Sequence, residues 1–276
     1  MTYKTILMHC NDKRRINALL APTLTLASAF ESHVVGLSVI PPVSVVATGA
    51  LEAPPIIVDA HCELYRKDIA PMRQQFEAAM SGRPVTFEWR DLDAGGFAVS
   101  DVVLNQGRAA DLIVASQTDP DWPLSEWLDV ADDVAAGSGR PVLIIPNGRA
   151  SALVGSRVLV AWKGTREAAR AAFDAVPILK RASAVRVISI GESDADTQPA
   201  TDICPSLARH GVNVEKAEQI STATGAGPAL VAEADAFEAD LVVMGCYGHS
   251  RLREFVFGGA TRHVLQKMRV PVLMSH

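Results

Sequence analysis

The chain has 276 residues, of which 49% are hydrophobic and 21% charged, and its formal net charge at pH 7 is −5. This balance is typical of a globular chain with a sizeable core and excludes a disordered one. The negative charge argues against nucleic acid or an anionic membrane as a partner. No apolar run approaches the roughly 18 residues of a membrane span. Four scattered cysteines and an N-terminus without a signal peptide predict a cytoplasmic protein.

Taken in chain order, short apolar runs alternate with helical stretches in two series of five. This pattern is typical of buried parallel strands with helices on both faces. The predicted strands lie near 3–10, 33–40, 84–91, 111–116 and 141–146, then near 156–162, 184–190, 212–218, 240–245 and 270–275. We therefore predict an α/β protein with two tandem doubly wound, Rossmann-like domains, each with a five-stranded parallel sheet.

The two series repeat one another. Ile6 in the first strand matches Val158, 152 positions later, whereas Asp111 matches Asp240, 129 positions later. The offset shrinks because the first series carries extra chain between Pro41 and Pro55, which is rich in Pro, Val and Ala and predicts an irregular excursion. We place the domains at 1–147 and 152–276, joined by a short polar linker.

The most informative stretch follows the fourth strand of the second domain. Gly245 and Gly248 leave the strand end, and Gly258-Gly259 precede a helix that runs through Thr261. Glycines let a backbone approach a ligand closely, and the free amides of a helix start favour phosphate. Arg251 supplies positive charge nearby. Because ligands of doubly wound sheets bind at the carboxyl ends of the strands, this stretch predicts an anion site.

The spacing of Gly245, Gly248 and Gly258 resembles the G-x2-G-x9-G-[S/T] motif of nucleotide-binding universal stress proteins, and the whole chain resembles two copies of that family's domain. The resemblance implies ATP or a related adenine nucleotide, with or without Mg²⁺. It implies phosphate and ribose contacts in the glycine turns and an adenine contact at Ile190. The implied site is Ala161, Trp162, Lys163, Ile190, Met244, Gly245, Gly248, Arg251, Gly258, Gly259, Ala260 and Thr261.

Two positions depart from the family's pattern. Position 259 is Gly where the pattern has Ser or Thr, and Lys163 stands where the family has an acidic residue that reaches the nucleotide. Lysine cannot accept a hydrogen bond, although it can pair with a phosphate. Thr165 is expected to be the N-cap of the helix that follows.

The first domain lacks the motif. Its fourth strand is followed by residues 116–123, which contain two prolines, two aspartates and Trp122, and its last helix opens with Asp132-Asp133. Acidic side chains repel a phosphate, so we expect this domain to bind no nucleotide. Cys246, between the two loop glycines, is expected to be an exposed thiol.

These observations favour a stress-response regulatory protein that binds an adenine nucleotide in its second domain. We expect the two domains to pair internally, as single-domain relatives pair in dimers, and a homodimer or another protein partner stays open. The alternatives are a scaffold without nucleotide, which rests on Lys163 and Gly259, and a weak Mg²⁺-dependent ATPase. The sequence shows no assembled general base or metal-ligand set, so any hydrolysis is expected to be slow, with no catalytic residue and no metal site assigned.

Overall fold

The computed structural model describes residues 2–43, 54–148, 151–191, 201, 203–248 and 259–276. Within these residues ten strands form one sheet, in the order β3-β2-β1-β4-β5-β10-β9-β6-β7-β8. The N-terminal half, up to residue 147, holds β1 (Thr5–His9), β2 (His33–Ile40), β3 (Thr86–Asp93), β4 (Leu112–Ser116) and β5 (Val142–Ile145). The C-terminal half, from residue 152, holds β6 (Arg157–Ala161), β7 (Ala184–Ile190), β8 (Val214–Ile220), β9 (Leu241–Gly245) and β10 (Val272–Ser275).

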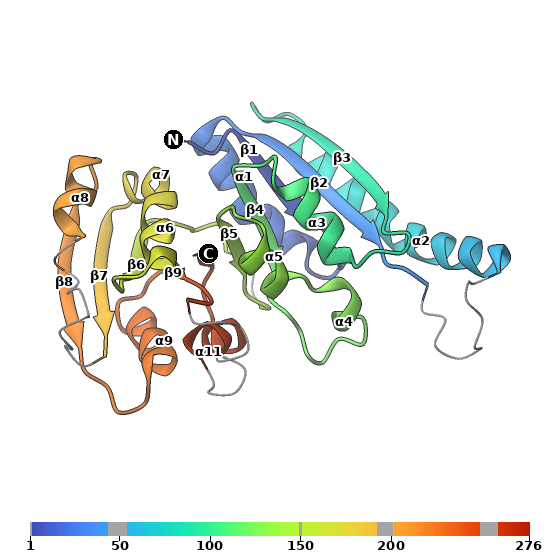
Figure 1. Ribbon diagram of the computed structural model, residues 1–276. Coiled ribbons are helices and arrows are strands. Elements are labelled where there is room, and N and C mark those ends of the chain that lie inside the picture. Colours follow the sequence, from blue (N-terminus) through green and yellow to red (C-terminus); the bar gives the residue numbers. More distant parts are fainter. Residues whose placement is uncertain (1, 44–53, 149–150, 192–200, 202, 249–258) are drawn as a thin grey trace.

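Helices cover both faces of this sheet (Figure 1). One face carries α1 (Ile16–Phe30), α2 (Pro55–Met80), α6 (Arg166–Asp174), α7 (Val176–Leu179) and α8 (Cys204–Arg209). The other face carries α3 (Val99–Gly107), α4 (Ser125–Leu128), α5 (Ala131–Gly137), α9 (Ala226–Ala236) and α11 (Ala260–Lys267). Side chains alternate along each strand, so Ile6 and Met8 join one apolar cluster and Leu7 joins the other. The predicted fold class is confirmed.

Each half has the same strand order. In the N-terminal half β1 lies between β2 and β4, and in the C-terminal half β6 lies between β7 and β9. The order in which successive strands are added to the sheet therefore reverses at β1 and again at β6. The carboxyl ends of strands at such a reversal point form the crevice in which doubly wound sheets bind ligands.

The two halves meet at one pair of strands, which the sequence reasoning did not predict. β5 and β10 pair in antiparallel fashion, with Leu143 opposite Leu273, whereas the other paired strands run parallel throughout the described residues. Both strands are completely buried. Each half would otherwise expose an apolar edge strand with unpaired backbone groups, and the pairing satisfies both edges.

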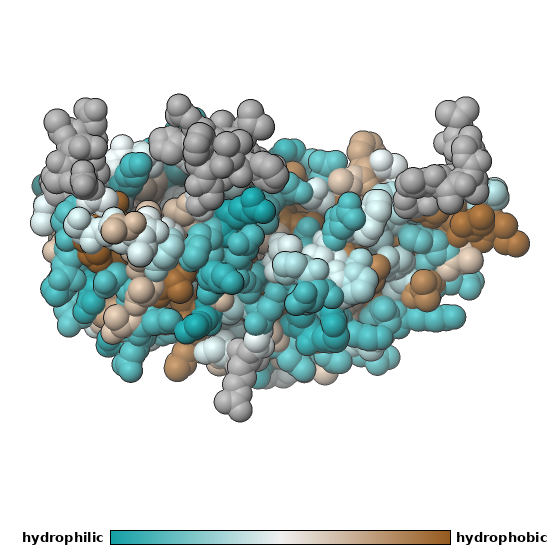
Figure 2. All heavy atoms as spheres, turned by 90° about the horizontal axis from the view of Figure 1, so that it is seen from below, coloured by the Kyte–Doolittle hydropathy of each residue, from teal (hydrophilic) through white to brown (hydrophobic). Residues whose placement is uncertain are grey.

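Helix α2 extends beyond the sheet at the end of the molecule opposite β8 (Figure 1). Its buried residues are Cys62 and then four side chains from Ile69 to Met80, so its first turns add little to the core. Ile56, Ile57 and Leu64 are instead exposed, and Figure 2 shows an apolar patch at this end of the molecule. No helix of the described residues is both long and apolar enough for a membrane span.

Candidate functional site

A cavity of about 360 Å³ opens at the carboxyl ends of β6, β7 and β9. Its volume lies in the range of small-molecule sites. Every residue of the implied site that the structure describes lines this cavity, whereas Arg251 and Gly258 lie outside the described residues. The lining residues not anticipated from the sequence are Thr165, Glu167, Ala168, Ile188, Ala226, Leu230 and Tyr247.

One side of the cavity is apolar. Ala161 at the end of β6 pairs with Ile188 of β7, and Ile190 follows two residues later on the same side of the strand. Met244 of β9 and Leu230 of α9 complete this side. Because Ala161 has only a methyl group, the strand ends leave room for a flat apolar ring.

The opposite side is built around the glycine turn after β9. A Cβ atom added to Gly245 would lie 2.5 Å from the backbone nitrogen of Ala168, at the start of α6. Glycine at this position therefore lets the end of β9 pack directly on the first turn of α6. A Cβ atom on Gly248 would lie 3.1 Å from Oε2 of Glu167. This glycine thus faces a carboxylate.

Glu167 is the most consequential residue that the sequence reasoning missed. It is buried, lines the cavity, and forms an ion pair with the exposed Arg166. Burial is the largest influence and acts to raise the pKa of Glu167, but the hydrogen bonds to the carboxylate and the charge of Arg166 together outweigh it, so the pKa lies below its usual value. The carboxylate is therefore ionised at neutral pH. Lys163, two residues before the Thr165 cap, is exposed at the rim.

The helix starts around the cavity are arranged as expected. The hydroxyl of Thr165 accepts a hydrogen bond from the backbone N–H of Ala168, which confirms it as the N-cap of α6. Gly259 is the N-cap residue of α11 and lines the cavity together with Ala260 and Thr261. The Thr261 hydroxyl accepts a hydrogen bond of 3.2 Å from the backbone N–H of Tyr247.

The glycine turn is held by the other half of the molecule. Tyr247 lies in the left-handed region at φ 55°, and its hydroxyl donates a hydrogen bond to the carboxylate of Asp132, at the start of α5. Cys246 is buried, and its thiol donates to the carbonyl of Ala135 at 3.4 Å. The expectation of an exposed thiol at Cys246 was wrong, because α5 of the N-terminal half covers it.

The matching region of the N-terminal half is filled. His9 pairs with Leu37 as Ala161 pairs with Ile188, so a buried imidazole stands where the other half has a methyl group. Trp122 and Leu128 line the remaining space, a cavity of only about 130 Å³. Neither ring nitrogen of His9 has a hydrogen-bond partner among the described residues. Burial, followed by the charge of Arg15, lowers the pKa of His9 to about 4.

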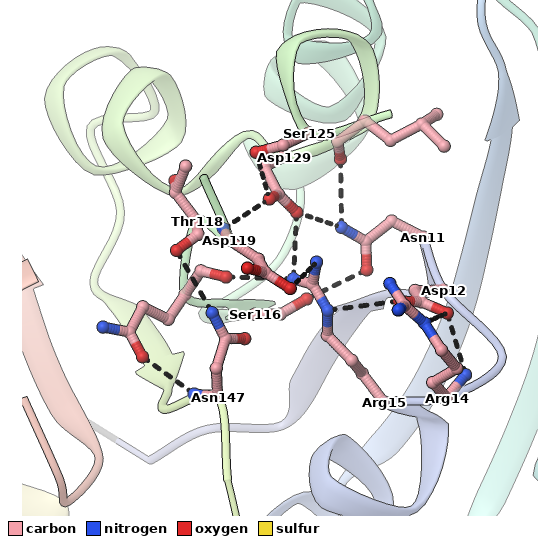
Figure 3. A network of polar contacts seen from close by, with 12 residues as sticks. Asn11, Asp12, Arg14, Arg15, Ser116, Thr118, Asp119, Ser125, Asp129 and Asn147 are labelled. Atoms are coloured by element: carbon pink, nitrogen blue, oxygen red, sulfur yellow. Dashed lines mark hydrogen bonds and ion pairs between the residues drawn. The ribbon is translucent and has the colours of Figure 1, made fainter. Parts of the chain in front are cut away.

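The polar end of that region is crossed by charged side chains that bind one another (Figure 3), and a cavity of about 210 Å³ remains beside them. Counting from the paired strands, Ser116 and Asp119 stand where the C-terminal half has Gly245 and Gly248. Arg15 lies 3.0 Å from the carboxylate of Asp129 and 3.8 Å from that of Asp119. Within the described ranges, no group of three or more His, Cys, Asp or Glu side chains is arranged to hold a metal ion.

Comparisons with known proteins show what this chain resembles. The universal stress protein family model matches residues 156–276. A universal stress protein of Synechocystis sp. is 29% identical over 92 residues, which are 32% of this chain and 31% of that protein. The chain thus spans about a third of the length of this curated relative.

Two solved structures resemble the chain over nearly its whole length. A universal stress protein from Archaeoglobus fulgidus gives a TM-score of 0.70 at 17% identity, with 98% of this chain and 95% of that one covered. A universal stress protein from Pseudomonas aeruginosa gives 0.56 at 16% identity, with 99% and 93% covered. At such identities the likeness concerns the fold. Residues 156–276 therefore match the universal stress protein family model, and the N-terminal half repeats the same fold.

Proposed function

We propose that the C-terminal half, as a domain spanning 152–276, binds an adenine nucleotide, and that the protein is a cytoplasmic stress-response regulator. The observation that carries this proposal is the cavity at the carboxyl ends of β6, β7 and β9, which gathers the described residues of the implied site around one space. The N-terminal half, as a domain spanning 1–147, binds no nucleotide in this proposal, because the buried His9 and the ion pair of Arg15 with Asp129 stand where a base and a phosphate would lie.

The two sides of the cavity fit the two ends of a nucleotide. Ala161, Ile188 and Ile190 offer an apolar surface for an adenine ring. Across the cavity, Gly259 and Ala260 present the first turn of α11, whose backbone amides have no partner within their own helix. Such amides, with the helix dipole behind them, stabilise a phosphate by about 0.3–1 kcal/mol at an exposed site.

Glu167 determines which form of the nucleotide fits. An ionised carboxylate facing Gly248 repels a bare polyphosphate, whereas Mg²⁺ binds well between one carboxylate and phosphate oxygens. In this proposal Glu167 holds Mg²⁺ and the exposed Lys163 pairs with a phosphate from the rim. The metal supplies charge neutralisation between the carboxylate and the phosphates when it is bound.

Glu167 also favours a second candidate function, a stress-response scaffold that binds no nucleotide. Its negative charge adds to the two departures from the family's motif at Lys163 and Gly259. In that case the cavity binds no nucleotide, and the surface of the two paired halves binds a protein partner or a second copy of the chain.

Isothermal titration of the intact protein with adenosine, AMP, ADP and ATP, each with and without Mg²⁺, separates the two candidates. The nucleotide proposal predicts saturable binding of at least one adenylate, with ATP bound more tightly when Mg²⁺ is present. Mass measurement of small molecules released by denaturing the purified protein gives an independent readout, namely retained adenylate. Absence of heat with all four compounds, together with no released adenylate, favours the scaffold.

A further inference from the structure

A single carboxylate lies at the centre of the polar network in the N-terminal half. The side chain of Asp129 is completely buried, and its two oxygens accept four hydrogen bonds (Figure 3). The donors are Arg15 Nη1 at 3.0 Å, Asn11 Nδ2 at 2.7 Å, the Ser125 hydroxyl at 2.7 Å and the Asp119 backbone N–H at 2.8 Å. We call these four donors the anion seat.

The anion seat occupies the place where the other half carries its glycine turns. Asn11 follows β1 as Lys163 follows β6, and Arg15 stands at the start of α1 as Glu167 stands at the start of α6. The donor at Asp119 belongs to the position of Gly248. Three of the four donors thus come from positions whose counterparts line the cavity of the other half.

The carboxylate itself also comes from a glycine-motif position. Val130 is the N-cap residue of α5, just as Gly259 is the N-cap residue of α11. Asp129, one residue earlier, is therefore the sequence counterpart of Gly258, the last glycine of the motif. The motif has a glycine at this position, whereas the N-terminal half has an aspartate, whose carboxylate lies in the site.

Arg15 supplies the positive charge of the anion seat, and the contacts of its side chain hold it in place. It is nine-tenths buried, its Nη1 also donates to the carbonyl of Gln117 at 2.9 Å, and its guanidinium stacks on Trp122 at 4.7 Å from the ring centroid. Its Nη2 makes no hydrogen bond to any described residue. Nε of Arg15 also lies 3.4 Å from the buried carboxylate of Asp12, but its hydrogen bond is to Asp129, and a buried guanidinium that loses such a partner is costly.

We propose that the N-terminal half retains an anion-binding site of carboxylate class and that Asp129 occupies it as a ligand supplied by the chain itself. The site then accepts a small carboxylate from solution once the side chain of Asp129 is shortened. The proposal also explains why this half needs no nucleotide, since the carboxylate of Asp129 already supplies the negative charge that a phosphate would bring.

Asp129→Ala tests the proposal, because alanine keeps Cβ and leaves a space into which formate fits as the missing carboxylate. We expect the variant to melt roughly 10 °C below the wild type. Sodium formate in the 100 mM range is expected to restore at least half of that loss in a saturable manner, while sodium chloride at equal ionic strength restores little. The wild type, whose seat is full, is expected to respond equally to both salts.

Asp129→Asn is the matched control. It removes the same charge, but its amide still fills the seat, so formate is expected to act on it no more than chloride does. The proposal is overturned if formate and chloride act alike on Asp129→Ala, or if Asp129→Asn gains as much from formate. Should Asp129→Ala not fold in buffer alone, its refolding is titrated with formate. Recovery of folded protein with formate supports the proposal, and its absence at all concentrations contradicts it.

Discussion

The ends of β6 and β9 and the ends of β1 and β4 are built on one topology and differ in side-chain volume and charge. In the C-terminal half Ala161, Gly245 and Gly248 leave a cavity, whereas His9, Ser116 and Asp119 stand at the same positions of the N-terminal half. The starts of the first helices also differ in sign, with Arg15 in one half and Glu167 in the other. One backbone thus supports an open site and a filled one.

The difference shows how the two copies of a duplicated fold can take different roles. In the filled half the polar groups bind one another, in the anion seat around Asp129. It also braces the open half, because α5 covers Cys246 and Asp132 binds the hydroxyl of Tyr247, between the two glycines of the open site.

Ala161→His gives the open half the residue of the filled half, and we expect the largest effect from it. The imidazole occupies the apolar side of the cavity, so adenylate affinity is expected to fall about 100-fold, or about 2.7 kcal/mol. Titration calorimetry measures it, with the melting temperature as a check on folding. The reverse change, His9→Ala, is the control and is expected to create no second site, since Trp122 and Leu128 remain. A folded Ala161→His variant with wild-type affinity would place the ligand elsewhere.

His9→Leu is expected to flatten the dependence of stability on pH. In the wild type the pKa of His9 is about 4 when folded and about 6.5 when unfolded. The unfolded chain therefore binds the proton first, and stability is lost as the pH falls from about 6.5 toward 4. Between pH 7 and pH 5 this loss amounts to about 2 kcal/mol, which denaturant titrations at the two pH values can measure.

The wild type, titrated with denaturant at the same two pH values, is the reference for that comparison. If His9→Leu loses as much stability as the wild type between pH 7 and pH 5, then His9 is not held neutral in the fold.

Glu167→Gln removes the charge that opposes phosphate in the open site. We expect its affinity for ATP without Mg²⁺ to rise about tenfold, or about 1.4 kcal/mol, and the advantage given by Mg²⁺ to shrink. Binding of adenosine, which carries no phosphate, is the internal control and is expected to stay the same. An equal change for ATP and adenosine would mean that Glu167 acts on the shape of the cavity and not through its charge.

Tyr247→Phe tests the contact between the halves and is expected to have the smallest effect. Loss of the hydrogen bond to Asp132 should lower the free energy of unfolding by about 1 kcal/mol. Adenylate affinity should fall by a few fold, since the turn between Gly245 and Gly248 loses its brace. The free energy of unfolding and the adenylate affinity are both measured on the same preparation. An unchanged affinity with lowered stability would show that the contact only joins the halves.

Much of the fold follows from local sequence, because buried parallel strands and their helices have clear apolar patterns. The cap at Thr165 is where its side chain predicts. The expected strands lie within two residues of the observed ones at most ends. The glycine spacing also led to residues that do line one cavity.

What escaped prediction depends on contacts between distant segments. The apolar runs of β5 and β10 indicate burial but not that each is the other's partner. Cys246 looked exposed because it lies between loop glycines, whereas α5 of the other half covers it. Glu167 lies in the first turn of a helix and carries no motif of its own, and only the close approach of Gly248 places its carboxylate in the site.

The central claim is that one half binds an adenine nucleotide and the other does not. Equilibrium dialysis of radiolabelled ATP with Mg²⁺ against the wild-type protein measures the number of sites per chain directly. The account predicts saturation at one nucleotide per chain for the wild type and no measurable binding to Ala161→His at the same concentrations. Two nucleotides per chain, or none, would contradict it.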